Sequence, residues 1–269
     1  MKVMSFEGIE EAKKPIFFCS FGKDSSVVLH GLREGGWLDK TLVVFVDCGG
    51  VFPDIVEWAQ REGANMPRYF HLHAPGDIWE DIRKYGWSTD VEIADLGRHS
   101  NLLQRTPVSL TQRVRPWTQC TYDRFWMPGF VFTQMYRPDL YISGEKQMDR
   151  PYANDWETRT HGVQNALRPV FDWSDEDVWE YIDAHGIELA PSFRGRQPDR
   201  RDCYLCFGHD LTVGRVQYLK DNFPELYDRI FNQEGFAALV PHMVEQLEKT
   251  SKAWKDVQEL LEEDNGRRQ

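Results

Sequence analysis

The sequence predicts an α/β protein built around a mostly parallel sheet. Apolar runs of strand length alternate with helical segments along the first quarter of the chain. This alternation is typical of βαβ units, whose crossovers are right-handed. The expected strands cover Ile16–Cys19, Leu42–Val46 and Arg68–His73, and the expected helices begin near Ser25 and at Asp54.

The middle of the chain gives weaker signals. Between residues 75 and 135, Gly, Pro, Trp and Arg interrupt any hydrophobic period, so we expect loops and short helices there. Asp139–Ser143 and Leu167–Phe171 are the next expected strands. The second of these belongs at a sheet edge, because Pro169 has no backbone N–H to donate.

Two further helices are expected in the C-terminal half. Ser174 is an N-cap with Asp177 in the capping-box position, and Gly186 ends this helix. Apolar residues spaced from Val240 to Leu261 predict a long amphipathic helix. That helix either packs on its own domain or binds a partner.

Composition limits the classes of protein to which the chain belongs. A formal net charge of −11 argues against a general nucleic-acid-binding surface, so we expect nucleic acid only as a modified substrate. The sequence has no apolar N-terminal segment and no run of about 18 apolar residues, so we expect a soluble cytoplasmic protein with no membrane partner. Five cysteines, an odd number, favour a reducing compartment over a disulfide framework.

The segment Ser20–Ser25 joins the first expected strand to the first helix. Gly22 lets the backbone approach a ligand closely, and the helix N-terminus offers unsatisfied N–H groups to an anion. Lys23 adds a full positive charge. The segment is not a Walker A loop, because Phe17 stands where that pattern requires glycine. The sequence therefore predicts a polyphosphate site of another kind.

This segment resembles the PP-loop of ATP pyrophosphatases, in the form found in the phosphoadenosine phosphosulfate (PAPS) reductase-like family. Three later segments resemble the same family in the same order: Val46–Pro53, Gly144–Arg150 and Arg168–Trp179. The resemblance implies a doubly wound, mostly parallel five-stranded sheet with helices on both faces and a helical C-terminal extension. The nucleotide is expected at the carboxyl ends of the strands.

We expect two domains on this basis. Residues 1–190 form the nucleotide-binding α/β domain, and residues 191–269 form an Arg- and Cys-rich loop with a helical extension packed on that domain.

The resemblance also assigns site residues. Lys23 and Asp24 are the catalytic candidates, with ATP, PAPS or adenylylsulfate and Mg²⁺ as the expected ligands. Asp47 either contacts the ribose or a metal, or is only a turn former; Lys146 and Arg150 either hold a phosphate or sulfate group or are solvated. The expected nucleotide-binding residues are Ser20, Phe21, Gly22, Lys23, Asp24, Ser25, Ser26, Asp47, Gly144, Lys146 and Arg150.

The cysteines suggest a second site. Cys203 and Cys206 are three positions apart, and two thiolates with this spacing can reach one metal ion or cluster. A redox pair and two inert thiols are the alternatives. Assimilatory adenylylsulfate reductases hold a [4Fe–4S] cluster with a Cys-Cys pair and a Cys-x-x-Cys, and Cys120 lies where that pair would be. We therefore expect Cys120, Cys203 and Cys206 to bind an iron–sulfur cluster, with zinc completed by His209 as the alternative.

An arginine-rich segment precedes the pair Cys203 and Cys206. Four guanidinium groups in a short stretch either recognise an anion or form a solvated loop. They belong to Arg194, Arg196, Arg200 and Arg201.

Three functions remain open. The first is cleavage of ATP between its α and β phosphates to adenylylate an acceptor in sulfur metabolism or sulfur insertion. The second is reduction of PAPS or adenylylsulfate, which the absence of cysteine after Cys206 disfavours, because the family's reductases use a C-terminal cysteine nucleophile. The third is a non-catalytic nucleotide-sensing subunit, which docks through its C-terminal helix or forms a homo-oligomer.

Overall fold

The computed structural model describes residues 2–89, 114–149, 160–194, 196, 203–207, 212–237, 239–240 and 252–267. The chain divides into two compact units, Met1–Pro75 with Tyr122–Gln197 (unit 1) and Gly76–Thr121 with Pro198–Gln269 (unit 2). These units differ from the expected domains 1–190 and 191–269. The physical reason is that residues 76–121 supply two strands of a small sheet that residues 206–207 complete.

A five-stranded sheet forms the centre of unit 1. Its strand order is β3-β2-β1-β6-β7 and every neighbouring pair is parallel, which confirms the predicted fold class. The strands are β1 (Pro15–Phe18), β2 (Leu42–Asp47), β3 (Tyr69–His73), β6 (Leu140–Ile142) and β7 (Ala166–Leu167).

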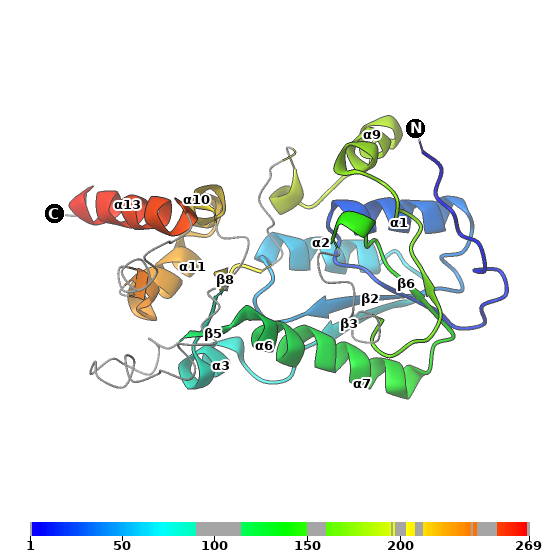
Figure 1. The fold of residues 1–269 in the computed structure, drawn as a ribbon, viewed down its shortest axis with the longest axis horizontal. Coiled ribbons are helices and arrows are strands. Elements are labelled where there is room, and N and C mark those ends of the chain that lie inside the picture. The colour runs from blue at the N-terminus through cyan, green and yellow to red at the C-terminus, as the bar shows by residue number, and fades with distance from the viewer. Residues whose placement is uncertain are drawn as a thin grey trace. The chain divides into compact units, whose positions relative to one another are not determined.

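Helices cover both faces of this sheet (Figure 1). The helices α1 (Lys23–Glu34) and α2 (Pro53–Gly63) lie over one face, and α7 (Met127–Tyr136) lies over the other. The core on the α7 side contains alternate residues of the strands, as a period of two requires. These residues are Ile16, Phe18, Val44, Val46 and Tyr141, with Phe132 and Tyr136 of α7 packed against them.

The helix α9 (Asp175–His185) begins with the predicted capping box. The Ser174 hydroxyl accepts a hydrogen bond from the Asp177 N–H, and the Asp177 carboxylate accepts one from the Ser174 N–H. Gly186 ends the helix in the left-handed conformation at φ 60°. Unit 1 also contains the short helical turns η2 (Tyr122–Trp126), η3 (Gln147–Asp149) and η4 (Pro191–Phe193).

Unit 2 contains a three-stranded parallel sheet of order β5-β4-β8. Trp87 packs against Phe207 and Phe236, and these rings form an aromatic core. The strands are β4 (Trp87–Thr89), β5 (Val114–Pro116) and β8 (Cys206–Phe207). The helices are α3 (Ile78–Tyr85), α6 (Trp117–Thr121), α10 (Val213–Asn222), α11 (Pro224–Asp228), η5 (Arg229–Gln233) and α13 (Lys252–Arg267).

The C-terminal helix α13 corresponds to the end of the predicted amphipathic pattern. Its residues Val257 and Leu261 are buried, and Asp264 forms an ion pair with Lys220 of α10. The described part of the helix thus packs within its own unit. None of the helices in the described ranges has the length and apolar content needed to cross a bilayer.

Candidate functional site

The carboxyl ends of the parallel strands of unit 1 meet at one sheet edge. The connections from β1 run to β2 and β3 on one side, whereas β6 and β7 lie on the other side. The strand order therefore reverses between β1 and β6. In open α/β sheets, ligands bind in the crevice at this reversal point. The loop after β1 and the turn after β6 both end there.

The loop after β1 is held by its own serines. The Ser20 hydroxyl accepts a hydrogen bond from the Gly22 N–H at 3.3 Å and lies 3.1 Å from the Ser25 hydroxyl oxygen. The Ser26 hydroxyl donates to the Phe21 carbonyl at 3.2 Å. The N-cap residue Gly22 supplies no side-chain hydrogen bond to α1. The first N–H groups of a helix have no partner within the helix and can bind an anion.

Gly144, in the turn after β6, lies against the start of α1. A Cβ atom at this position would lie 2.9 Å from both the Asp24 carbonyl carbon and the Ser25 backbone nitrogen. Only glycine permits this close approach. The approach brings the next segment, and Lys146 with it, beside the loop Ser20–Ser25, which we call the phosphate loop after its predicted role.

Two lysines and two aspartates form a compact cluster beside the loop. The Lys23 ammonium lies 2.9 Å from Asp24 Oδ1 and 2.6 Å from Asp175 Oδ1. The buried Lys146 ammonium lies 2.7 Å and 2.9 Å from the same two oxygens. We call Lys23, Asp24, Lys146 and Asp175 the charge cluster. Its four formal charges sum to zero.

Ion pairing shifts the pKa values within the charge cluster. Burial alone would raise the pKa of the Asp175 carboxyl, but hydrogen bonds from Lys146 and Lys23 lower it to about 2. Burial alone would lower the pKa of Lys146, but the neighbouring Asp24 and Asp175 raise it above its usual value. Asp175 and Lys146 are therefore charged at neutral pH.

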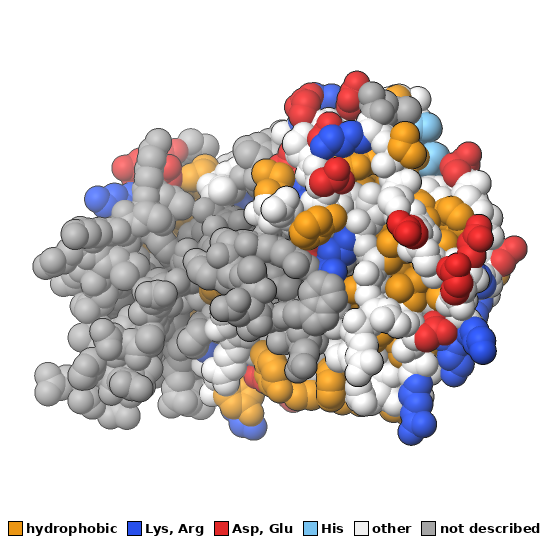
Figure 2. All heavy atoms as spheres, turned by 45° about the vertical axis from the view of Figure 1, so that its right-hand side comes forward, with side chains coloured by type: hydrophobic (Ala, Val, Ile, Leu, Met, Phe, Trp, Pro, Cys, Tyr) orange, Lys and Arg blue, Asp and Glu red, His pale blue; other side chains and the backbone are white. Residues whose placement is uncertain are grey.

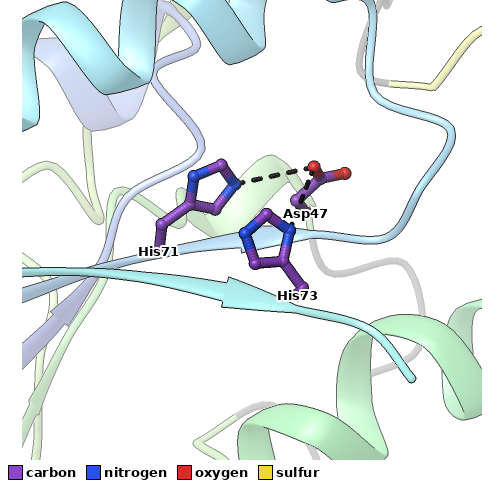
Figure 3. A group of neighbouring side chains, drawn as sticks. All are labelled: Asp47, His71 and His73. Atoms are coloured by element: carbon purple, nitrogen blue, oxygen red, sulfur yellow. Dashed lines mark ion pairs between the residues drawn. The ribbon is translucent and has the colours of Figure 1, made fainter. Parts of the chain in front are cut away.

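Asp47, at the end of β2, faces two imidazoles of β3 (Figure 3). Its Oδ2 atom lies 3.5 Å from His71 Nε2 and 3.6 Å from His73 Nδ1. Burial and the neighbouring His73 lower the pKa of His71. Among the residues that the structure describes, this is the group whose three possible metal-ligand atoms lie within 4.8 Å of one another.

The three predicted cysteine ligands all belong to unit 2. Cys120 lies on α6, directly after β5, and Cys203 and Cys206 form a turn that enters β8. These thiols are not among the described sets whose ligand atoms lie within 4.8 Å of one another. Their role as ligands of a cluster or of zinc stays a prediction.

Buried polar groups surround these cysteines. Arg115 is 3% exposed and donates from Nη2 to Cys120 Sγ at 3.2 Å. Register places Arg115, Ser88 and Cys206 side by side on β5, β4 and β8. Within the described structure, the Arg115 Nε and Nη1 atoms and the Ser88 hydroxyl have no hydrogen-bond partner. Buried donors of this kind normally have an acceptor.

Four other predicted residues lie outside the part of the chain that the structure describes: Arg150, His209, Arg200 and Arg201. Arg196 is an exposed side chain that pairs with Glu176 and Asp183, as the solvated reading expects.

Sequence reasoning missed Asp175, His71, His73 and Arg115 as site residues. The alternation His71-Leu72-His73 was a usable signal, because a strand places such residues on one face. Asp175 gave no such signal, because its partner Lys23 is distant in the sequence.

Charge is mixed on the face of the protein drawn in Figure 2. Acidic and basic side chains are interspersed over its described part, without a broad basic area.

Comparison with known proteins places the chain in a family. The family model described as the phosphoadenosine phosphosulfate reductase domain matches residues 14–195. The chain belongs to this family. The matched range contains the loop Ser20–Ser25 and the whole charge cluster.

Curated relatives carry the same description. The chain is 24% identical over 174 residues to a phosphoadenosine 5′-phosphosulfate reductase of Xanthomonas campestris, a match that covers 64% of this chain and 63% of the relative. It is 23% identical over 187 residues to the enzyme of that name from Xylella fastidiosa, with 66% of each chain covered. The chain thus spans slightly less than two thirds of the Xanthomonas relatives.

Two solved structures are also similar. A PAPS reductase from Candida auris, solved as a phosphate complex, matches with a TM-score of 0.41 and 12% identity, over 66% of this chain and 75% of that one. A U34-tRNA thiolase from Methanococcus maripaludis, solved with its [4Fe-4S] cluster, matches with a TM-score of 0.41 and 11% identity, over 93% and 77%.

Proposed function

We propose that this protein is a sulfur-metabolism enzyme that binds ATP, or a related adenine sulfonucleotide, at Ser20–Ser26. In the proposed reaction, the α–β bond of ATP is cleaved, an acceptor is adenylylated and pyrophosphate leaves. The observation that carries this proposal is the charge cluster, in which Lys23 and Lys146 converge on the start of α1.

The lysines would exchange partners when a nucleotide binds. In the structure they are neutralised by Asp24 and Asp175. A polyphosphate lying against the helix N-terminus would compete for both ammonium groups, and its charge would also be stabilised by the loop amides. Such groups stabilise the charge that develops on the phosphates as the bond breaks.

The same cluster fits Mg²⁺. The carboxylate oxygens of Asp24 and Asp175 are the ligand type that Mg²⁺ prefers. When bound, the ion would supply charge neutralisation of the phosphates. Lys23 and Lys146 would keep their role of binding and orienting the nucleotide.

The cysteine region of unit 2 fits an anionic, hydrogen-bond-accepting group. Arg115 and Ser88 are buried beside Cys120 and Cys206 with donor atoms that have no partner in the described structure. Hydrogen bonds to thiolate and sulfide sulfurs are a usual feature of iron–sulfur sites. We propose that Cys120, Cys203 and Cys206 hold a [4Fe–4S] cluster, with zinc as the alternative. A cluster would supply a bound iron for sulfur chemistry.

Product analysis tests the reaction. The protein is purified without oxygen and incubated with MgATP, using sulfate and, separately, bulk tRNA as acceptor probes. We expect AMP and pyrophosphate in equal amounts when an acceptor is adenylylated and discharged. Formation of ADP and inorganic phosphate would place the cleavage at the wrong bond and contradict the proposal.

Metal analysis tests the cysteine site. Iron and acid-labile sulfide are measured in the anaerobic wild-type protein and in Cys203→Ser, with Cys48→Ser of unit 1 as the matched control. We expect the serine at position 203 to remove most of the iron and the control to retain it. Iron-free wild-type protein that contains zinc would favour the alternative metal.

Reduction of a sulfonucleotide is the second candidate function, and the names of the curated relatives favour it. No cysteine follows Cys206 in this sequence to act as the expected nucleophile. Sulfite formed from PAPS or adenylylsulfate and a dithiol would nevertheless establish it. Nucleotide that binds tightly but is not turned over would instead indicate the sensing subunit.

A further inference from the structure

We propose that Asp47, His71 and His73 bind one divalent transition-metal ion, of the zinc, iron or cobalt class, at the carboxyl edge of β2 and β3. This proposal stands on the geometry of the three side chains and is independent of the reaction proposed above.

Strand register brings the three residues together. Asp47 of β2 is paired with His73 of β3, and His71 lies two positions earlier on the same strand. Residues two apart on a strand, and residues paired across parallel strands, point to the same face. The two imidazole rings accordingly stack with their centroids 4.0 Å apart, and both lie against the Asp47 carboxylate (Figure 3).

The carboxylate is already oriented. Its Oδ1 atom accepts a hydrogen bond from the Gly49 N–H at 2.8 Å, which directs Oδ2 toward the imidazoles. His71 is fixed from the other side by the ring of Phe45, 5.1 Å away. A bound cation would thus find two of its three ligands in place.

The buried nitrogen of His71 points to a missing ligand. Its Nε2 atom is shielded from solvent, and in the described structure Asp47 Oδ2, 3.5 Å away, is at the outer limit of hydrogen-bond distance. A buried polar atom in this state is unfavourable. A metal ion between the imidazoles and the carboxylate would satisfy this nitrogen and bring the ligand atoms closer together.

The donor set selects the class of metal. Two imidazole nitrogens and one carboxylate oxygen suit zinc, iron or cobalt, whereas Mg²⁺ and Ca²⁺ prefer oxygen ligands. Three protein ligands leave at least one coordination position open for water or a substrate atom. The side chain of His73 is 66% exposed, so this open side is accessible to solvent.

The proposed metal site lies near the proposed nucleotide site. Neighbouring strands lie about 4.8 Å apart, so the ends of β2 and β3 are roughly 5–10 Å from the end of β1, where the phosphate loop begins. A metal at Asp47 therefore shares a sheet edge with the proposed nucleotide site.

Cobalt titration of the metal-free, full-length protein tests the proposal. Cobalt bound by two imidazoles and a carboxylate gives visible d–d bands without the near-ultraviolet charge-transfer band that thiolate ligands add. This spectrum separates the site from the cysteine region. We expect one equivalent of Co²⁺ to bind with the nitrogen–oxygen spectrum, to be displaced by Zn²⁺ and not to be displaced by Mg²⁺.

One substitution tests a ligand directly, and a second variant serves as its control. Loss of a hydrogen-bond partner of a ligand costs 10–100-fold in metal affinity, so we expect loss of a direct ligand in His73→Gln to cost about 100-fold or more. Because the side chain of His73 is exposed, we expect this variant to fold as the wild type does. The control is His185→Gln, because the His185 ring also lies near another imidazole, that of His30, with the ring centroids 5.0 Å apart.

The control should bind Co²⁺ as the wild type does. A wild-type protein without the nitrogen–oxygen spectrum, or a His73→Gln variant with unchanged affinity, would overturn the proposal and leave an Asp–His ion pair. Neither result would bear on ATP turnover, so failure of this proposal is distinguishable from failure of the proposed function.

Discussion

At the scale of single residues, Phe21 shows how the phosphate loop keeps its shape without glycine at that position. Its backbone is left-handed, with φ 58°, and its side chain is fully buried against Phe45 and Tyr69. A left-handed residue other than glycine costs about 1–2 kcal/mol, whereas removal of a buried phenylalanine ring costs about 3–5 kcal/mol. Burial of the ring therefore outweighs the backbone strain.

Gly144 gives a residue-scale prediction. Gly144→Ala forces a Cβ atom against the backbone of Asp24 and Ser25, which cannot rotate away as a side chain would. We expect a loss of about 1–3 kcal/mol in the free energy of unfolding. Because α1 must shift, ATP affinity should fall as well, as calorimetric titration would show.

Gly36→Ala provides the comparison for Gly144. A Cβ at Gly36 meets open space but has a strained φ of 71°. This variant should lose stability without losing ATP affinity. Equal ATP affinity in wild type and Gly144→Ala would disprove the role given to the close approach at α1.

His161 gives a prediction about pH. Burial lowers the pKa of its imidazole to about 4, below the ordinary value of 6.5, despite a hydrogen bond with the Trp126 carbonyl. Between these values the unfolded chain binds a proton that the folded chain does not. The contribution of His161 to the free energy of unfolding is therefore fully present above pH 6.5. This contribution falls by roughly 3 kcal/mol as the pH drops to about 4.

The slope of stability against pH measures this effect. Asn tolerates the left-handed backbone at His161, where φ is 51°, so His161→Asn is a suitable variant. Urea unfolding at pH values from 4 to 7 should show a smaller slope for the variant, whatever its absolute stability. The same slope in both proteins would show that His161 is not the titrating group.

At the scale of elements, the sequence predicted the features that depend on interactions between residues close together in the chain. The capping box of Ser174 and Asp177 was predicted, because its bonds join residues three apart. Short helices were expected in the region of α7, but this helix was not located, because its sequence is apolar on most sides and shows no helical period. The strands β4, β5 and β8 are too short for any period to be recognised. The predicted strand at Leu167–Phe171 contains only Leu167 of β7, because the chain turns at Pro169.

The cap of α9 gives the element-scale prediction. Ser174→Ala removes the side-chain acceptor of the Asp177 N–H, and we expect a loss of about 0.5–2 kcal/mol in the free energy of unfolding. Ser174→Thr keeps a hydroxyl acceptor at this position and should retain most of the stability that Ser174→Ala loses. An alanine variant as stable as the wild type would show that the cap contributes nothing measurable.

At the scale of the whole molecule, the two proposed chemistries lie in different units. The charge cluster and the Asp47 group belong to unit 1, and Cys120, Cys203 and Cys206 belong to unit 2. The sequence predicted the sheet of unit 1, because its strands, loops and helices are consecutive there. It did not predict the discontinuous unit 2, because β4 and β8 are distant in sequence and pair only in the fold.

Lys23 is the residue on which the proposed function depends most. Nucleotide binding and ATP-to-AMP turnover should be measured together in the wild type, Lys23→Ala and Lys220→Ala. Lys220 is the matched control, because its ion pair with Asp264 in unit 2 has the same 2.6 Å length as that of Lys23 with Asp175. We expect Lys23→Ala to remain folded and to lose turnover by at least about 100-fold, while the control keeps wild-type activity. Normal turnover by Lys23→Ala would contradict the assignment of the phosphate loop.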